Sequence, residues 1–418
     1  MDSIVIKSAL IEGELVAPPS KSMTIRAIAA SLLACGKSTI IDPSFSDDGL
    51  ASISLVNRLG GSFKVEDRRV IVEGTNGLKS PIKDSLIDCL ESGLCARMFI
   101  PICALKDEEL IVDGRGTLKK RPIGNLDELR EFNIHCTSDN GYLPVRVKGR
   151  VKGASTTLDG SLTSQIISGL LFCLPLTEKD SFLHIKEAKS KPYIRMTLEI
   201  LKMAGVKIEA QDHLSAIYIQ GGQSLQPLTY TVEGDWSSAS FFLVGAAISG
   251  SIFVKNLVYQ SEQADRRIID ALYQCGAKVE VTPEGVWVQK DRIKPFKFDV
   301  SDCPDLFPPL CVLAACAEGK STIYGVERQL FKESNRLLSM CEGFKRLGIN
   351  FELNGTIITI EGRSSIKGGT IDPHQDHRIA MAFAILGLRS DEGIEILNPR
   401  CTKKSYPEFF KELSRIRR

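Results

Sequence analysis

The stretch NRLGGSFKVEDRRVIVEG, residues 57–74, reads as the end of a helix, a glycine and then two short strands of alternating apolar and polar residues. The pattern returns four times, and a glycine or an asparagine follows the helix each time. These two residue types best adopt the left-handed conformation that often ends a helix. The helix-ending residues are 73, 72, 71 and 72 positions apart, which predicts a structural repeat. They are Gly60, Asn133, Gly205, Gly276 and Gly348.

Two helices precede each strand pair. The first is apolar almost all round, as in LCVLAACA (residues 310–317), and such a helix is typical of a buried layer. The second is amphipathic, as in ESNRLLSMCEGFKRLG (residues 333–348), and should lie outside. We expect the first series to begin near Lys21, Ser92, Thr163, Asp235, Asp305 and His377, and the second near Asp48, Arg121, Lys191, Gln263, Lys332 and Lys404.

The repeat predicts an α/β fold of two similar domains, each with three βαβαββ-like repeats of about 72 residues and buried helices. The sixth repeat has both helices but no strand pair after them, so we expect the N-terminal strand, residues 4–6, to complete it. One domain is then discontinuous. The expected domains are residues 14–231 and residues 232–418 plus 1–13, joined by two chain connections that suit hinge closure.

The composition limits the kinds of partner. The chain has 53 Lys and Arg against 51 Asp and Glu, which provides no chain-wide field for nucleic acid or an acidic membrane. No stretch reaches the ~18 apolar residues of a membrane span, and residues 1–10 lack the apolar core of a secretory signal. The twelve cysteines form no CxxC pair, so we expect free thiols, no metal site and a cytoplasmic protein.

Basic residues recur at the expected helix starts, where the helix dipole favours negative charge by about 0.3–1 kcal/mol. Each alone is best explained as a solvated surface charge, but together they favour a site for a phosphate or several carboxylates. Small polar residues accompany them, and each is also an ordinary N-cap. Asp305 and Glu333 share this edge as a candidate base and acid, or as simple helix caps. The basic residues are Lys21, Arg26, Arg97, Arg121, Lys191, Lys332, Arg336, Arg378 and Lys404, and the small polar residues are Ser20, Ser22, Ser92, Gly93, Thr163, Ser164, Gln165 and Ser190.

At these positions the chain resembles the 5-enolpyruvylshikimate-3-phosphate synthase (3-phosphoshikimate 1-carboxyvinyltransferase) family nearly end to end. The resemblance implies two three-repeat domains with helix N-termini facing an active site in the interdomain cleft. The matching motifs are SKSMTIRA (Ser20 to Ala27), KRPIG (Lys120 to Gly124), DGSLTSQ (Asp159 to Gln165), SKPY (Ser190 to Tyr193), EGDWSSAS (Glu233 to Ser240), KESNR (Lys332 to Arg336) and DHRIAMAF (Asp376 to Phe383).

The resemblance also implies the reaction and its residues. The family transfers the enolpyruvyl group of phosphoenolpyruvate to the 5-hydroxyl of shikimate-3-phosphate, in the shikimate pathway to chorismate and the aromatic amino acids. By motif match, Asp305 accepts the hydroxyl proton, Glu333 protonates the methylene group, and Lys21 assists. The resemblance further implies a monomer without a cofactor. Its shikimate-3-phosphate contacts fall on Lys21, Ser22, Arg26, Thr163, Ser164, Gln165, Ser190, Asp305 and Lys332, and its phosphoenolpyruvate contacts on Lys21, Gly93, Arg121, Gln165, Arg336, Arg378 and Lys404.

Some positions depart from the family pattern. The common run NAGTAMRP reads ESGLCARM here (residues 91–98), Asn335 replaces an aspartate, and Thr163 replaces a serine while keeping the hydroxyl. Arg328 stands where some members use asparagine to touch substrate, so that contact is not transferred.

Two alternatives remain open. The sister family, UDP-N-acetylglucosamine enolpyruvyl transferase, typically has a reactive cysteine where this chain has Gly116 and an asparagine where it has Ser22. Both differences favour shikimate-3-phosphate as the acceptor. The second alternative is a non-catalytic repeat scaffold that binds polyanions such as RNA. The near-neutral charge and the absence of interleaved aromatic residues argue against it.

Overall fold

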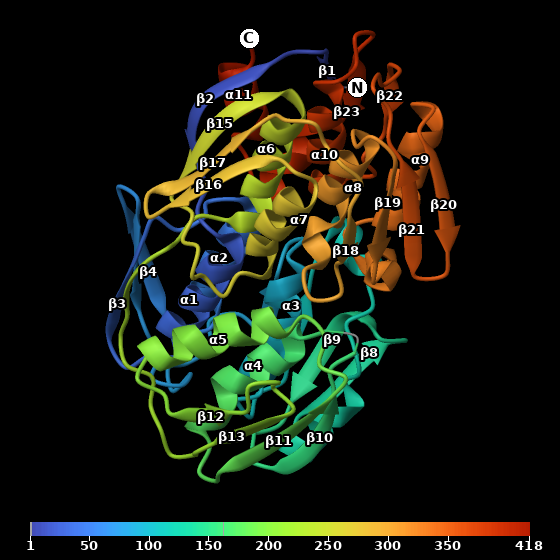
Figure 1. Cartoon of the computed structure of the whole chain (residues 1–418). Helices are drawn as coiled ribbons and strands as arrows, with labels where there is room; N and C mark the ends of the chain where they lie inside the picture. The colour runs from blue at the N-terminus through green and yellow to red at the C-terminus, as the bar shows by residue number, and fades with distance from the viewer. Residues whose placement is uncertain (1, 162) are drawn as a thin grey trace. The chain divides into compact units, whose positions relative to one another are not determined.

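The computed structural model describes residues 2–161 and 163–418. Met1, in the expected discontinuous domain, and Leu162, in the DGSLTSQ motif, lie outside the described residues. The chain divides into two compact units (Figure 1). We call Pro19–Val232 the continuous unit, and Met1–Pro18 with Glu233–Arg418 the discontinuous unit.

Three four-stranded sheets form the continuous unit, one for each repeat. In the second repeat, β6 (Leu86–Asp88) pairs in parallel with β7 (Leu110–Asp113). β7 then pairs antiparallel with β9 (Tyr142–Lys148), which forms a hairpin with β8 (His135–Asp139). The other two sheets repeat this order as β14-β3-β5-β4 and β10-β11-β13-β12, with β3 (Lys37–Ile41), β4 (Ser62–Glu66), β5 (Arg69–Glu73), β10 (Ser155–Asp159), β11 (Ser181–Lys186), β12 (Ile208–Ala210), β13 (Ala216–Ile219) and β14 (Thr229–Thr231).

The discontinuous unit also has three sheets, in the orders β16-β17-β15-β2, β18-β19-β21-β20 and β1-β23-β22. β1 (Ser3–Ile6) pairs antiparallel with β23 (Ile394–Leu397), so the N-terminal strand completes the sixth repeat, as the sequence predicts. The remaining strands are β2 (Ile11–Val16), β15 (Gly250–Lys255), β16 (Lys278–Thr282), β17 (Gly285–Gln289), β18 (Lys297–Asp299), β19 (Lys320–Tyr324), β20 (Asn350–Asn354), β21 (Ile357–Glu361) and β22 (Gly369–Ile371).

Each of the two connecting segments contains a strand that pairs with the unit preceding the connection in the chain, and not with the unit whose first helix follows it. β2 precedes the first helix of the continuous unit but pairs in parallel with β15, along its full length. β14 precedes the first helix of the discontinuous unit but pairs in parallel with β3. A boundary between residues 13 and 14 therefore falls inside β2, and the strand as a whole belongs to the discontinuous unit.

The predicted mixed α/β class and its buried helix layer are confirmed. Every residue of α3 (Gly93–Cys103), α8 (Phe307–Ala315) and α10 (His377–Gly387) is buried. Within the discontinuous unit, α6, α8 and α10 pack against one another (Figure 1). All six helices of this series begin within two residues of the expected starts; the other three are α1 (Lys21–Leu33), α4 (Gln165–Cys173) and α6 (Trp236–Ser249).

The outer series is only partly helical. Five α-helices are found where it was expected, with one apolar and one exposed side, but the second repeat has only short 3-10 segments there. All five helix-ending residues have positive φ, from 59° at Asn133 to 88° at Gly60, which confirms the anchor of the repeat. The outer helices are α2 (Asp47–Arg58), α5 (Lys191–Met203), α7 (Ile268–Gln274), α9 (Arg336–Arg346) and α11 (Phe409–Ile416). The 3-10 segments of the second repeat are η1 (Gly116–Lys120) and η2 (Asp127–Phe132), and those of the other repeats are η3 (Leu174–Leu176), η4 (Ala264–Arg267), η5 (Pro304–Leu306), η6 (Val326–Phe331) and η7 (Pro399–Lys404).

Three basic residues expected to open helices do not do so. Arg121 has an extended backbone, because the following Pro122 disfavours the helical conformation at the residue before it. Lys332 is also extended, and α9 begins four residues later because the Asn335 side chain caps it. Lys404 ends η7 rather than opening a helix. Lys21 and Lys191 do open α1 and α5, as expected.

Candidate active site

One arginine organises the acidic residues of the discontinuous unit. Arg336, the first residue of α9, has a side chain that is 1% exposed. Its Nη1 lies 2.7 Å from Asp305 Oδ1 and its Nη2 lies 2.7 Å from Glu333 Oε2, while Nε donates to Asp376 Oδ2 over 2.8 Å. A guanidinium has five N–H donors in a rigid fork, so it can fix several carboxylates at once. We call Asp305, Lys332, Glu333, Arg336, Asp376 and Arg378 the Arg336 cluster.

Asp305 has three cationic neighbours. Besides Arg336, its Oδ1 lies 3.4 Å from Lys332 Nζ, and its Oδ2 lies 3.2 Å from Arg378 Nη2. Burial raises the pKa of Asp305, but the three cations outweigh burial and hold that pKa well below its usual range. Asp305 is therefore a carboxylate at neutral pH and can accept a proton. Its basicity will increase when an anionic ligand takes over some of its cationic partners.

Asp376 joins two helices at this point and is 0% exposed. Its side chain caps α10 by accepting the Arg378 N–H over 2.9 Å, and it also accepts hydrogen bonds from Ser334. Asp376 thus fixes the start of α10 and the orientation of Arg336 together. Sequence reasoning did not select Asp376 as a site residue. The available signal was its capping position before His377 and Arg378 in the DHRIAMAF motif.

Two basic side chains of the cluster are suited to bind an anion. Arg378 Nη1 is buried and has no hydrogen-bond partner among the described residues. Burial lowers the pKa of Lys332 to about 8, although Asp305 raises it. Buried donors are normally paired, so a buried guanidinium N–H without a partner among the described residues is suited to bind an anion. Lys404 is also buried, in η7, which packs against α10.

A second group of predicted residues meets at the starts of α3 and α4 in the continuous unit. Arg97 Nη1 donates to Gln165 Oε1 over 3.0 Å and to the Gly93 carbonyl over 3.3 Å. A Cβ atom on Gly93 would lie 2.8 Å from Arg97 Nη1 and 2.9 Å from Arg121 Nη1. Both guanidinium groups therefore lie against the backbone of residue 93, where only glycine leaves them room. Sequence reasoning noted Arg97 as a basic residue near a helix start but did not assign it a contact.

Lys21 opens α1 and is held by a carboxylate. Its Nζ lies 2.9 Å from Asp48 Oδ2, and both side chains are largely buried. Ser20 caps the same helix, and Ser92 caps α3, so the capping explanation holds for these two serines. Ser164 and Ser190 occupy the N-cap positions of α4 and α5 without a side-chain cap hydrogen bond. Thr163 directly precedes Ser164, and its Oγ1 accepts the Gln165 N–H over 3.1 Å.

Arg26 has a structural role within the continuous unit. The residue is fully buried, and its Nε donates to Thr197 Oγ1 over 2.9 Å. Nη1 and Nη2 donate to the carbonyls of Ser22 and Tyr193, each over 2.9 Å. Burial lowers the pKa of Arg26 to about 10. The side chain therefore ties α1 to α5 and orients Ser22, whatever further contact it makes.

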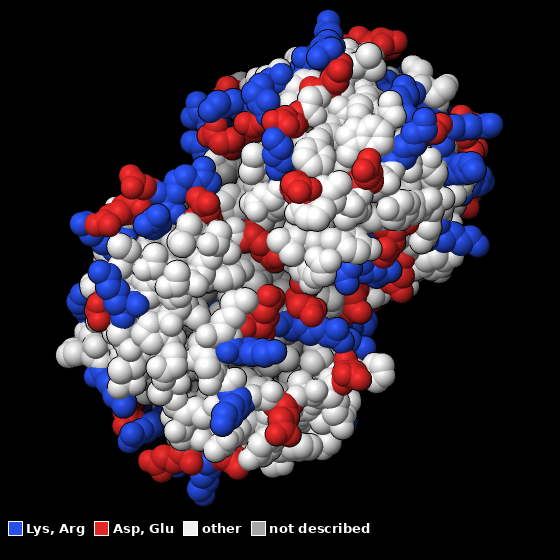
Figure 2. Space-filling model, turned by 60° about the vertical axis from the view of Figure 1, so that its left-hand side comes forward, with Lys and Arg blue, Asp and Glu red and all other residues white. Residues whose placement is uncertain are grey.

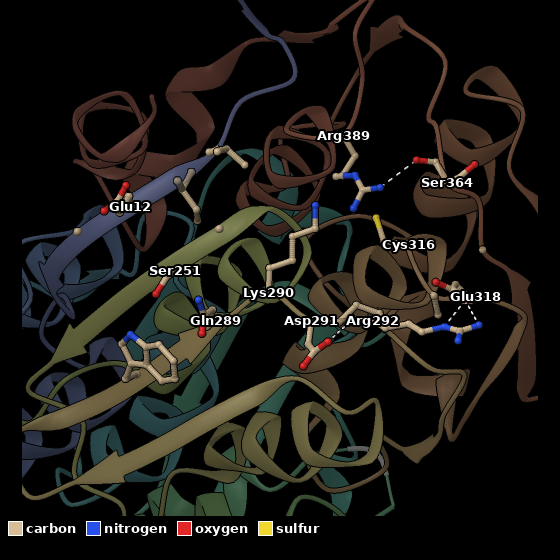
Figure 3. A pocket seen from close by; sticks show the side chains of 18 of the residues that line it. Glu12, Ser251, Gln289, Lys290, Asp291, Arg292, Cys316, Glu318, Ser364 and Arg389 are labelled. Carbon is tan, nitrogen blue, oxygen red and sulfur yellow. Dashed lines mark hydrogen bonds and ion pairs between the residues drawn. The ribbon is translucent and has the colours of Figure 1, made fainter.

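A pocket in the discontinuous unit lies elsewhere, where α6, α8 and α10 end. It has a volume of about 1200 Å³, and Gly250, Cys316 and Arg389 line it (Figure 3). Arg389 donates to the carbonyls of Ile248 and Ser364, each over 2.9 Å, which satisfies the carboxyl end of α6. None of the predicted site residues lines this pocket, so we assign no part of the active site to it.

No helix within residues 2–161 and 163–418 combines the length and apolar character needed to cross a membrane. Over the same residues, no group of three or more His, Cys, Asp or Glu side chains is arranged to hold a metal ion.

Comparisons with known proteins show the family to which the chain belongs. The family model for EPSP synthase (3-phosphoshikimate 1-carboxyvinyltransferase) matches residues 5–413. A 3-phosphoshikimate 1-carboxyvinyltransferase of Clostridium perfringens is 36% identical, covering 100% of this chain and 98% of the relative. A protein of the same name from Methanosarcina mazei is 38% identical, covering 98% of this chain and 97% of the relative. The solved EPSP synthase of Acinetobacter baumannii superposes with a TM-score of 0.83 at 26% identity, over 99% of this chain and 98% of that one. The chain belongs to the EPSP synthase family.

Proposed function

We propose that the chain transfers the enolpyruvyl group of phosphoenolpyruvate to the 5-hydroxyl of shikimate-3-phosphate, releasing phosphate. Family membership supports this reaction, and the strongest structural support for it is the Arg336 cluster. The cluster combines buried cations, a low-pKa carboxylate and an open Arg378 donor, which suits two anionic reactants and a proton transfer. The proposal includes a monomeric, cytoplasmic enzyme that acts without a cofactor.

In the proposed complex both units bind the same pair of substrates. The two chain connections, at residues 18–19 and 232–233, serve as the hinge for closure. At 4 Å and an effective dielectric near 20, each cation–anion contact is worth about 4 kcal/mol before desolvation is subtracted, so several contacts suffice to favour a closed state. Shikimate-3-phosphate contacts Lys21, Ser22, Arg26, Thr163, Ser164, Gln165, Ser190, Asp305 and Lys332, and phosphoenolpyruvate contacts Lys21, Gly93, Arg121, Gln165, Arg336, Arg378 and Lys404.

The proposed chemistry follows from the partners of Asp305. Substrate anions compete for Lys332, Arg336 and Arg378, which raises the basicity of the Asp305 carboxylate. Asp305 then takes the proton of the 5-hydroxyl as its oxygen bonds to C2 of phosphoenolpyruvate. Glu333, which Arg336 holds, delivers a proton to the methylene carbon. The tetrahedral intermediate that results then collapses: its methyl group returns a proton to the Glu333 carboxylate, the C2=C3 double bond forms again, and phosphate leaves with the proton that Asp305 took up.

The acceptor can be tested directly by phosphate release. Purified protein with phosphoenolpyruvate should release phosphate when shikimate-3-phosphate is added, and not when UDP-N-acetylglucosamine is added. Gly116 supports this choice, because a Cβ at residue 116 would lie 2.2 Å from Glu91 Oε1, so a cysteine there requires Glu91 to move. Phosphate release with UDP-N-acetylglucosamine but not with shikimate-3-phosphate would overturn the proposed function. So would the absence of release with both acceptors.

The polyanion scaffold has less support. On the face drawn in Figure 2, the described Lys and Arg side chains are interspersed with Asp and Glu, without an extended field of one sign. Nucleic-acid binding relies on such a field and falls steeply with salt. Tight, salt-dependent RNA binding would revive the scaffold alternative.

Replacing Lys21 with alanine should weaken the binding of both substrates by about 10–100-fold, the range for losing a charge-assisted hydrogen bond in a largely buried site. Titration calorimetry with each substrate measures the effect. Lys119→Ala is the matched control, because Lys119 pairs with Asp113 at an exposed position and should change neither affinity. Unchanged affinities in Lys21→Ala would refute its proposed contacts.

Raising the pH through about 8 should weaken shikimate-3-phosphate binding, because Lys332 then loses its charge. The dissociation constant should rise about tenfold for each pH unit above that pKa. Titrations between pH 7 and 9.5 measure this slope. Lys332→Arg, which stays protonated, should abolish it. A wild-type affinity that does not change over this range would contradict the contact.

A further inference from the structure

One buried carboxylate has no part in the proposed chemistry. Asp265, in η4, is 1% exposed. Its Oδ2 accepts a hydrogen bond from Ser237 Oγ in the first turn of α6. Its Oδ1 is buried without a hydrogen-bond partner among the described residues. Burying an unpaired carboxylate oxygen is costly, so this arrangement requires a physical explanation.

The charges around Asp265 link it to the Arg336 cluster. Burial and the Asp305 charge raise the pKa of Asp265, while Arg378 and the Ser237 hydrogen bond lower it, and the pKa that results is about 7. Asp265 therefore changes its protonation state within the ordinary working range of an enzyme. The groups that face it are Asp235 and Ser237 from the start of α6, Asp305 from η5, Arg378 from α10, and Cys303 from the segment before η5.

Two residues that interact electrostatically, Asp265 and Arg378, each have a buried polar atom without a hydrogen-bond partner among the described residues. Asp265 Oδ1 is the acceptor and Arg378 Nη1 is the donor. When Asp265 is protonated, the charge of Arg378 is balanced mainly by Asp305, and the open N–H is available to a ligand. When Asp265 is ionised, a second negative charge acts on the same guanidinium and competes with that ligand.

We propose that Asp265 is a positioning residue that controls phosphoenolpyruvate binding by setting, through Arg378, the charge offered to the anionic end of that substrate. The inference rests on the proposed function and deepens it, because it names the group that regulates the phosphoenolpyruvate end of the site. The neutral form of Asp265 favours binding, and the ionised form opposes it.

The pH profile of kcat/KM for phosphoenolpyruvate, at saturating shikimate-3-phosphate, tests the inference. One deprotonation near pH 7 should lower the wild-type value about tenfold between pH 6 and pH 8. Asp265→Asn stays neutral at residue 265 and should not show that fall. Any pH dependence of kcat/KM that comes from titration of phosphoenolpyruvate itself should remain in both proteins. Ser237→Ala removes a donor that stabilises the ionised form, so the fall should move to higher pH. A merely structural hydrogen bond would not shift the profile.

A second measurement does not depend on activity. Because the folded state binds a proton at Asp265 between about pH 4 and pH 7 that the unfolded state does not, stability should fall as the pH rises through this window. The urea midpoint of the wild type should therefore decline more steeply from pH 5 to pH 7 than that of Asp265→Asn.

The outcomes separate the two proposals. Turnover with identical pH profiles in wild type and Asp265→Asn, or with an unmoved profile in Ser237→Ala, overturns the role of Asp265 and leaves the proposed function standing. Equal urea slopes overturn the titration of Asp265 itself. Absence of turnover at every pH overturns the proposed function, and the inference with it.

Discussion

Replacing Asp305 with asparagine should lower kcat by about 10²–10⁴-fold, the usual contribution of a positioned general base. The substitution keeps the shape of the side chain and an oxygen that can accept from Arg336 Nη1, which now lies 2.7 Å from Asp305 Oδ1. It removes the negative charge that three cations hold and with it the group that takes the hydroxyl proton. The rate of phosphate release at saturating substrates measures the loss.

The control for Asp305 is an exposed acid of the same unit. Glu342, on α9, pairs with His374 at the surface, so Glu342→Gln should keep the wild-type rate. Circular dichroism should show that both variants are folded. A kcat for Asp305→Asn within threefold of wild type would exclude Asp305 as the base.

Replacing Asp376 with alanine should have the largest effect on stability, about 3–5 kcal/mol, because it breaks a buried ion pair and leaves Arg336 partly uncompensated. The substitution also removes the cap of α10 and the acceptor of the Ser334 hydrogen bonds. Urea unfolding measures the free energy. Activity should fall as well, since Arg336 Nε loses the partner that orients it.

Two further variants separate the causes. Asp376→Asn can still cap α10 and should recover part of the lost stability, while the charge remains absent. Asp372→Ala removes an exposed acid that accepts a hydrogen bond from the His374 N–H and should cost about 0.5 kcal/mol or less. A loss below about 1 kcal/mol in Asp376→Ala would mean that the buried pair contributes little.

The repeat could be predicted because its signals are local. The left-handed residue after each outer helix is set by neighbouring backbone atoms, and Gly60 and Asn133 carry that signal in the sequence itself. The buried helices could be predicted for the same reason, since α8 and α10 are apolar on every side. The predicted start of an outer helix at Arg121 was wrong, because Pro122 follows it and disfavours the helical conformation at residue 121.

The partners of the predicted cations could not be found from the sequence. Lys21 is held by Asp48, and Arg336 by Asp376, which are 27 and 40 positions away. Only the fold brings such residues together, and their local appearance is that of ordinary helix caps. Asp265 was missed for a similar reason, because its effect depends on burial beside Asp305 and Arg378 rather than on any motif.

We propose that the charged clusters of both units bind one pair of substrates. A crystal structure of Asp305→Asn with shikimate-3-phosphate and phosphoenolpyruvate tests it most directly. We expect ligand oxygens within hydrogen-bond distance, about 2.7–3.2 Å, of Lys21 and Arg121 in one unit and of Lys332 and Arg378 in the other. Ligands that contact residues of a single unit, or that occupy the pocket beside Arg389, would contradict it.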